Sequence, residues 1–414
     1  MKILFYATYP NQGIGYSKIG NKISNFLASK GHEVVYFGIS NFNEPQSKVE
    51  RYINPKIKFI DALLEEQKIG NNTELYGVNV FTSFIDKEKP DIVLIYNDII
   101  VTSRLYLEII KYLEFNKKFF KLFSYIDLVY EYERIELLEL LYKNSDKIFV
   151  FTDFWKKHLK NIFKDFSEIK DIHVFYHGIN SETLKIVDKK ESKEICGISK
   201  DDFVFLNTNR NTYRKANDLT ISAFLIFLKK KGLGSDFKLF LNSRIENTQS
   251  GYRFISLIKS ECIRLRLDHD FVLNNHILHF ANVISDEKMN HLFNACDVGM
   301  NTCIGEGFGL CNIEHASLGV PQIVSNVCSF KDIFKMVGDI TYVEPVTSIN
   351  ISCNMDDHAG LVHFCKAEDI AEKMEEVYNN YKDYKLKYEK FSKHLHRKYD
   401  WNVIFEKFHK DFLS

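Results

Sequence analysis

The stretch NTCIGEGFGLCNIEHASLGVPQIVSN, residues 301–326, places Glu306 and Glu314 on either side of a glycine–phenylalanine–glycine turn. The residues before the turn, DVGMNTC, have the apolar character of a buried strand. The residues after it, LCNIEHASLG, predict a helix that ends at Gly319, because glycine terminates helices and Pro321 follows. The stretch therefore predicts a strand, a tight turn and a helix in succession, which is the repeating unit of a parallel α/β sheet.

The same turn carries the first candidate binding groups. Backbone amides at the start of a helix have no partners within the helix, so they favour a phosphate or a sugar hydroxyl as ligand. The amides in question belong to Gly307, Phe308, Gly309 and Leu310. Glu314, about one turn into the helix, can accept hydrogen bonds from the paired hydroxyls of a ribose, and Glu306 from the other end of the same ligand. Two unrelated surface glutamates are the alternative, and the glycine turn between them speaks against it.

Strand-like runs alternate with amphipathic stretches along the rest of the chain, which predicts parallel strands joined by helices. The first series is predicted at residues 2–8, 33–39, 56–63, 91–97, 119–126, 147–152 and 172–178. The second is predicted at residues 203–209, 237–243, 276–282, 297–302, 321–326 and 340–345. Residues 180–202 between them are polar and suit a connection with a short helix. The sequence thus predicts an α/β fold of two Rossmann-like, doubly wound domains facing a cleft, with ligands at the carboxyl ends of the strands.

Composition narrows the class of protein. The chain has 414 residues, too many for one core of common size, and its 55 basic and 55 acidic residues cancel. This balance gives no indication of a nucleic-acid partner. No apolar run reaches the roughly 18 residues of a membrane span, and the N-terminal run resembles a strand more than a signal peptide. The eight cysteines show no C-x-x-C spacing, which argues against a zinc ribbon and favours a reducing, cytoplasmic setting.

A second candidate cluster is LNTNRNTYRKANDL, residues 206–219, at the end of the first strand of the second series. Arg210 and Lys215 bracket a turn that opens a helix, where cations could neutralise a diphosphate leaving group. Of the three cations, we interpret Arg214 as the bystander. If these side chains supply the positive charge, a divalent metal is not required; solvated surface charges are the alternative.

Two further motifs are weaker. Gly13 and Gly15 follow the first strand, but Lys18 stands where the dinucleotide fingerprint needs a third glycine. The pair suits close approach of the backbone to a ligand, or a simple tight turn. Asp268-x-Asp270 matches the sequence motif of a metal site, but it follows a charged helix and not a strand. We therefore interpret it as a surface loop.

The segment FNKKFFKLF, residues 115–123, raises the question of a membrane surface, because it mixes lysines with aromatic residues. A charged approach to a buried strand explains the same residues. We favour that explanation and keep weak membrane-surface contact as the alternative.

Taken together, GEGFGLCNIEHASLGVPQIVSN, NRNTYRKAND and the N-terminal glycine turn resemble the retaining GT-B glycosyltransferases of family 4, the group 1 type. ISDEKMNHLFNACDVGMNT and VFYHGIN extend the resemblance over most of the chain. It implies an acceptor-side domain over residues 1–183, a nucleotide-sugar-binding domain over 184–382, and C-terminal helices over 383–414 that return to the first domain.

The resemblance also implies roles for the candidate residues. Glu314 would hold the ribose of a UDP-, GDP- or ADP-sugar donor. Glu306 and the amides of the turn would hold the sugar and the diphosphate, and Arg210 and Lys215 would bind the phosphates. Gly13 and Gly15 would approach the donor. The sugar would pass with retention of its anomeric configuration to an acceptor hydroxyl, with no cofactor or metal and with the leaving diphosphate serving as base.

Two positions depart from the family pattern. Asp127 stands where many members carry a histidine near the sugar, and it could contact the sugar, contact the acceptor, or cap the following helix. Asn209 replaces the usual glycine before Arg210 and is counted with the donor-binding residues. Neither change removes a charge needed for donor binding. The sugar and the acceptor, whether glycan, lipid or protein, stay open.

Two rival functions fit part of the pattern. A sugar-nucleotide epimerase of similar two-domain shape would isomerise or hydrolyse the donor without an acceptor. A non-catalytic relative would bind sugar or nucleotide only. The spaced glutamates together with Arg210 and Lys215 favour transfer.

Overall fold

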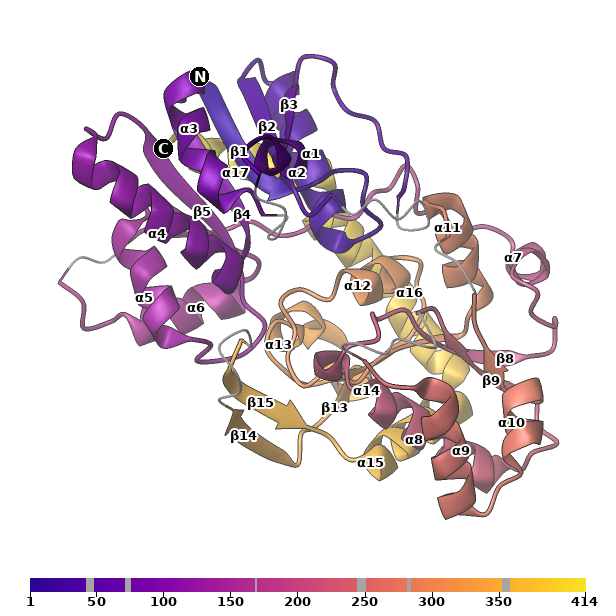
Figure 1. Cartoon of the computed structure of the whole chain (residues 1–414). Helices are drawn as coiled ribbons and strands as arrows, with labels where there is room; N and C mark the ends of the chain where they lie inside the picture. The colour runs from indigo at the N-terminus through magenta and orange to yellow at the C-terminus, as the bar shows by residue number, and fades with distance from the viewer. Residues whose placement is uncertain (42–47, 71–75, 168–169, 244–250, 281–283, 352–357) are drawn as a thin grey trace. The chain divides into compact units, whose positions relative to one another are not determined.

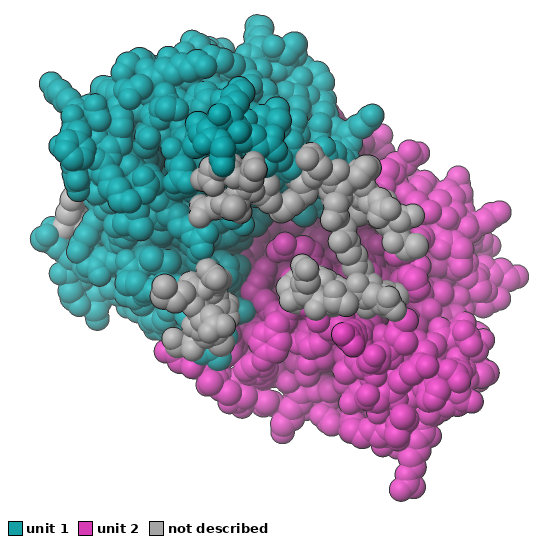
Figure 2. Space-filling view, viewed as in Figure 1, with its two compact units in different colours: residues 1–176, 351–360, 408–414 teal, residues 177–350, 361–407 magenta. Residues whose placement is uncertain are grey.

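The structure is a computed structural model, and it describes residues 1–41, 48–70, 76–167, 170–243, 251–280, 284–351 and 358–414. Contacts divide the chain into two compact units, coloured separately in Figure 2. The first unit comprises residues 1–176, 351–360 and 408–414, and the second comprises residues 177–350 and 361–407. Each unit has a parallel sheet with helices around it (Figure 1).

The first unit is built on a seven-stranded parallel sheet in the order β3-β2-β1-β4-β5-β6-β7. Its strands are β1 (Lys2–Thr8), β2 (Glu33–Ile39), β3 (Lys58–Asp61), β4 (Ile92–Asp98), β5 (Lys121–Asp127), β6 (Lys147–Val150) and β7 (Ile172–Val174). Its helices are α1 (Gly15–Ser29), α2 (Ala62–Lys68), α3 (Val78–Glu88), α4 (Ile99–Phe115), α5 (Ile135–Asn144) and α6 (Asp153–Ile162). The central strands are buried almost throughout, because runs such as KILFYAT present apolar side chains to helices on both faces.

The second unit contains a six-stranded parallel sheet in the order β10-β9-β8-β11-β12-β13. Its strands are β8 (Phe203–Asn207), β9 (Phe237–Leu241), β10 (Ile277–Leu278), β11 (Val298–Asn301), β12 (Gln322–Ser325) and β13 (Tyr342–Val343). Its first helices are α7 (Lys189–Ile195), the 3-10 turn η2 (Tyr213–Lys215), α8 (Asn217–Lys231), α9 (Phe254–Leu265), α10 (His269–Asn275) and α11 (Asp286–Ala295). Those that follow are α12 (Leu310–Ser317), α13 (Phe330–Ile333), η3 (Lys335–Val337), α14 (Gly338–Thr341), α15 (Ala367–Asn379) and α16 (Tyr381–Tyr399).

Several elements differ from the sequence expectation. The strand expected at residues 340–345 is only Tyr342–Val343, because Ile340 and Thr341 belong to α14. The strand expected at residues 276–282 is only Ile277–Leu278, and residues 281–282 lie outside the described part of the chain. A two-stranded sheet of β14 (Thr347–Ile351) and β15 (Gly360–Phe364) was not expected. The residues of β14 are mostly exposed, so they lack the apolar run that identifies a buried strand.

The last helix, α17 (Trp401–Leu413), starts in the second unit and ends in the first. Within the first unit the ring of Phe408 stacks on Phe175 at a centroid distance of 4.1 Å, and Phe412 meets Phe123 edge-on at 5.2 Å. The expectation of two Rossmann-like parallel-sheet domains whose C-terminal helix returns to the first is therefore confirmed. Among the described residues, no helix has the length and apolar character needed to cross a bilayer.

Candidate functional site

Two loops of the second unit leave its sheet at neighbouring strands. One follows β8 and leads through η2 into α8, and the other follows β11 and leads into α12. β8 and β11 pair directly although they are not consecutive, so the order of the strands reverses between them. In an open parallel sheet this reversal, at the carboxyl ends of the strands, is where ligands bind.

Glu306 lies in the second loop and is held by groups from both. Its carboxylate forms an ion pair with Lys215 Nζ and accepts hydrogen bonds from Arg214 Nη1 at 3.5 Å and Asn301 Nδ2 at 3.3 Å. The residue is only 5% exposed. Burial would raise the pKa of Glu306, but the charges of Lys215 and Arg214 outweigh it and lower the pKa to about 2. Glu306 is therefore ionised at neutral pH.

Arg214 is not a bystander, and this corrects the sequence interpretation. Its Nη1 donates to the carbonyl oxygen of Gly305 at 2.9 Å, in addition to its longer contact with Glu306. Its own carbonyl oxygen accepts a hydrogen bond from the amide of Ile304 at 3.0 Å. The spacing of charged residues along the sequence could not separate Arg214 from Lys215, because only the 3-10 turn directs both side chains to one loop.

A buried network of side-chain amides supports the cluster. Asn301 Nδ2 donates to Asn312 Oδ1 at 2.9 Å and to Asn209 Oδ1 at 3.3 Å, and Asn301 Oδ1 accepts from the amide of Cys303. Asn312 Nδ2 in turn donates to Gln322 Oε1 at 2.9 Å. All of these amide side chains are buried. Of them only Asn209 was a candidate from the sequence; Asn301 could have been found because it is polar and ends a predicted buried strand.

The start of α12 depends on Gly309. Gly309 has φ 79°, and a Cβ there would lie 2.1 Å from Phe330 Cε1, so only glycine fits. Within the described parts of the chain, the amides of Phe308, Gly309 and Leu310 have no hydrogen-bond acceptor. The ring of Phe308 is buried against His177 at a centroid distance of 4.7 Å. The backbone of this turn is thus available to an acceptor group, while the phenylalanine side chain serves packing.

Glu314 and Arg210 lie on the segments that follow the same two strands, Glu314 after β11 and Arg210 after β8. Glu314 is buried within α12, one turn beyond Leu310. Arg210 is exposed in the turn after β8, and its carbonyl oxygen accepts from Asn217 Nδ2 at 3.1 Å. α12 ends at Ser317 with Gly319 at φ 73°, as the sequence predicted. The roles of Glu314, Arg210 and Gly307 stay predictions.

The first unit brings Asp127 and the glycine turn together. Gly13 and Gly15 are exposed between β1 and α1, and Tyr16, the next residue, donates its hydroxyl to Asp127 Oδ2 at 2.5 Å. Asp127 ends β5 beside Asp98, which ends β4 in register with it. The suggestion that Asp127 caps a helix is wrong, because α5 begins at Ile135. Tyr16 and Asp98 were missed, although Asp98 directly follows the strand predicted at residues 91–97 and Tyr16 directly follows Gly15.

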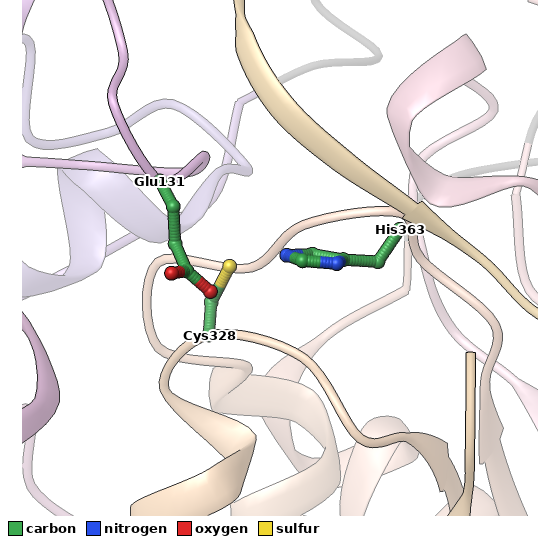
Figure 3. Close-up of side chains that lie close together, drawn as sticks. All are labelled: Glu131, Cys328 and His363. Atoms are coloured by element: carbon green, nitrogen blue, oxygen red, sulfur yellow. The ribbon is translucent and has the colours of Figure 1, made fainter. Parts of the chain in front are cut away.

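Among the described residues, no group of three or more metal-binding side chains lies within a single unit. Asp268 caps α10 by accepting from the amides of Asp270 and Phe271, as expected of a surface loop. In the second unit the ring of His363 points toward Cys328 Sγ (Figure 3). Glu131, also labelled there, belongs to the first unit. Cys328 and His363 make two ligands, fewer than the three or four that zinc takes from a protein. The described cysteines are all free, and Cys353 lies outside the described residues.

Comparisons with known proteins bear on the whole chain. A family model described as glycosyl transferases group 1 matches residues 188–394, which is half of the 414 residues. No curated protein sequence matches. Among solved structures, the chain is similar to a sucrose-phosphate synthase from Thermosynechococcus elongatus, with a TM-score of 0.71 at 13% identity over 100% of this chain and 98% of the other.

Two further structures show the same fold over comparable spans. A glycosyltransferase from Rickettsia africae has a TM-score of 0.65 at 16% identity, covering 99% of this chain and 97% of the other. An Anabaena protein solved in complex with UDP-glucose has a TM-score of 0.66 at 12% identity, covering both chains completely. The TM-scores of these structures support the fold, and the family model supports the class of enzyme. The chain belongs to the glycosyl transferases group 1 and is a glycosyltransferase with the GT-B fold.

Proposed function

We propose that the protein transfers a hexosyl group from a nucleotide-sugar donor to an acceptor hydroxyl, with retention of anomeric configuration and without a metal ion. The observation that carries the proposal is the cluster in the second unit. There Lys215 and Arg214, from η2 after β8, meet the ionised Glu306 in the loop after β11, and among the described residues the amides of Phe308, Gly309 and Leu310 have no hydrogen-bond acceptor. A carboxylate, cations and amides suit a sugar joined to a diphosphate.

Each group then has a separate task. Lys215, with Arg210 from the same turn, neutralises the diphosphate, and the amides of Phe308, Gly309 and Leu310 donate hydrogen bonds to its oxygens. Glu306 accepts hydrogen bonds from the sugar hydroxyls, while Glu314 accepts from the ribose. Asn209, fixed by its hydrogen bond from Asn301, lies at the start of the turn that carries the cations. Asp127 with Tyr16 is assigned to the sugar or to the acceptor.

The reaction requires no nucleophilic side chain. The bond between the anomeric carbon and the phosphate oxygen breaks, and the acceptor oxygen forms its bond to the same face of that carbon. The acceptor proton passes to the departing diphosphate. Orientation of the two substrates and stabilisation of the developing phosphate charge by Lys215 supply the rate enhancement.

The first test is a donor screen by thermal shift in the presence of EDTA. A ligand that binds only the folded state raises the melting temperature. We start with UDP-sugars, because the similar Anabaena structure is a UDP-glucose complex, and continue with GDP- and ADP-sugars. The proposal expects one class of donor to stabilise the protein without metal. Binding or turnover that is lost in EDTA and restored by manganese would contradict the metal-independent mechanism.

The second test separates the rival functions and uses the donor found in the screen. A transferase hydrolyses its donor only slowly until a competent acceptor is added, and then forms a product with the anomeric configuration of the donor. Candidate acceptors are a glycan, a lipid and a protein. Conversion of the donor to a stereoisomer without acceptor would indicate an epimerase, and tight binding with no turnover across the acceptor panel would indicate a non-catalytic protein. Contact with a membrane surface stays a separate prediction for residues 115–123.

A further inference from the structure

Arg214 is tied to the loop that carries Glu306 at three successive residues. Its carbonyl oxygen accepts from the amide of Ile304, and its Nη1 donates to the carbonyl oxygen of Gly305 and to Glu306 Oε1. The side chain is 19% exposed and thus largely buried beside this loop. Arg214 therefore fixes both the course of the backbone before Glu306 and one oxygen of the carboxylate.

Lys215 contacts the other carboxylate oxygen, Oε2, and the proposed function needs Lys215 for the donor diphosphate. If Lys215 turns to the diphosphate, the buried carboxylate of Glu306 loses that cation. A buried carboxylate without a cationic partner is strongly unfavourable. Asn301 still donates to Oε2, but an amide supplies a dipole and not a charge.

The groups facing Glu306 from each element can be named. Lys215 and Arg214 come from η2, Asn301 ends β11, and Ser329 Oγ donates to the carbonyl oxygen of Glu306. Cys303, in the same loop, stays a neutral thiol because burial and the charge of Glu306 raise its pKa well above the usual value. Among the described residues, Arg214 is thus the cation left to Glu306 when Lys215 is engaged elsewhere.

We infer that Arg214 is a positioning residue of the transfer reaction, which keeps Glu306 ionised and in place while Lys215 binds the diphosphate of the donor. The inference rests on the proposed function, because it takes the role of Lys215 from there. It divides the two neighbouring cations between two partners: Lys215 serves the leaving group and Arg214 serves the carboxylate. Lysine at position 214 would keep the charge but not the planar guanidinium whose Nη1 donates to both Gly305 and Glu306.

The first experiment compares the pH dependence of kcat and of kcat/KM for wild type and Arg214→Gln. kcat reports the substrate complex and kcat/KM reports the free enzyme. In the free variant Lys215 still holds Glu306, so kcat/KM should keep nearly its wild-type pH profile. In the complex Glu306 has no cation, so kcat should gain an acid limb that falls about tenfold per pH unit. A merely structural defect would lower kcat by the same factor at every pH.

A double-mutant cycle with Glu306→Gln tests whether Arg214 acts through Glu306. Arg214→Gln should lower kcat at pH 6 by roughly tenfold or more in the wild-type background. It should add little in the Glu306→Gln background, because residues in contact couple. Arg214→Lys should recover part of the loss. Arg264→Gln is the matched control, since Arg264 forms an exposed salt bridge with Glu261 on α9 and should leave kcat unchanged. Equal losses of kcat in the wild-type and the Glu306→Gln backgrounds would overturn the role of Arg214.

A measurement independent of turnover keeps the two proposals distinguishable. Carboxyl-¹³C glutamate NMR, with Glu306→Gln to assign the signal, gives the pKa of Glu306 directly. In Arg214→Gln, saturating inorganic diphosphate should raise this pKa by more than it does in wild type. An unchanged pKa, in a variant that binds diphosphate, refutes the role of Arg214. A wild-type protein that binds neither inorganic diphosphate nor any nucleotide sugar refutes the proposed function instead.

Discussion

At the scale of single residues, the second unit keeps the buried carboxylate of Glu306 charged. Glu306 lies away from solvent, and burial by itself would favour its neutral form. Lys215 and Arg214 outweigh that tendency because η2 brings two consecutive cations to the same loop. A charged acceptor is therefore ready before any ligand arrives, as electrostatic catalysis requires.

Glu314→Ala tests the ribose assignment. We expect the dissociation constants for the nucleoside diphosphate and for the full donor to rise by similar factors, because both contain the ribose. The loss of hydrogen bonds to a charged group, about 1.5–3 kcal/mol, corresponds to roughly 10- to 150-fold. Isothermal titration calorimetry measures both, with inorganic diphosphate as a ligand that should bind unchanged. Glu287→Ala on the exposed face of α11 is the matched control. Unchanged affinity for the nucleoside diphosphate would rule out this role.

Residue patterns predicted part of this cluster. The sequence alone identified Glu306, Gly309 and Lys215, because the pattern of a turn between a strand and a helix can be recognised in it. It did not identify Arg214 and Asn301, because Arg214 contacts Glu306, and Asn301 contacts Asn209, across about ninety residues of the chain. A single sequence does not show which distant residues are in contact.

At the scale of elements, the start of α12 depends on the left-handed conformation of Gly309. Gly309→Ala should lower the free energy of unfolding by about 1–3 kcal/mol through backbone strain and the clash with Phe330. Gly197→Ala is the matched control, because Gly197 also has a left-handed φ of 68° but nothing lies within 4 Å of an added Cβ. Urea denaturation compares the two. Equal destabilisation would show that the packing against Phe330 is not what fixes this turn.

The loop after β5 is held by a charged pair within the first unit. Glu133 is fully buried, accepts from the amides of Val129 and Tyr130, and forms an ion pair with His358 Nδ1. Burial would lower the pKa of His358, but the charge of Glu133 outweighs it and raises the pKa to about 9. Because the folded pKa is raised, the pair stabilises the fold fully below about pH 6.5 and loses this contribution as the pH rises through about 9.

His358→Gln should therefore be less stable than wild type by about 1.5–3 kcal/mol at pH 6, with a difference that shrinks markedly by pH 10. Chemical denaturation at a series of pH values measures this difference. His269→Gln controls for general effects of pH, because His269 is a partly exposed histidine at the start of α10 that lies beside its sequence neighbour Asp270. A stability difference that is the same at pH 6 and pH 10 would contradict the ion pair.

Elements also show where sequence patterns stop being informative. The central strands of both sheets were predicted because buried parallel strands are continuous apolar runs. The β14–β15 pair was missed, because Thr347–Ile351 is largely exposed and has neither such a run nor regular alternation. β10 proved shorter than expected, since HILHFAN is apolar at several positions but, among the described residues, only Ile277 and Leu278 pair with β9.

At the scale of the whole molecule, each unit contains residues from distant parts of the chain. Residues 408–414 complete the first unit although the preceding segment belongs to the second. Phe408 packs on Phe149 and Phe175, and the carbonyl oxygen of Asp411 accepts a hydrogen bond from Lys147 Nζ. The end of the chain is thus part of the core of the first unit.

Phe408→Ala should destabilise the first unit by about 3–5 kcal/mol, the usual result of removing a buried aromatic ring. Leu413→Ala, at a half-exposed position on the same helix, is the control and should change little. Limited proteolysis combined with mass spectrometry locates the region that opens. Cleavage that stays as slow as in wild type within β5, β6 and β7 would contradict the structural role of the C-terminal helix.

The central claim, that the second unit holds the donor with Glu306 at the sugar and not at the nucleotide, is tested most directly by Glu306→Gln in one preparation. The turnover number and the dissociation constant for the nucleoside diphosphate are measured side by side. We predict that turnover falls about tenfold to a thousandfold, while nucleoside diphosphate binds as well as before or more tightly, because Lys215 no longer pairs with a carboxylate. Normal turnover, or a loss of diphosphate binding as severe as in Glu314→Ala, would contradict the assignment.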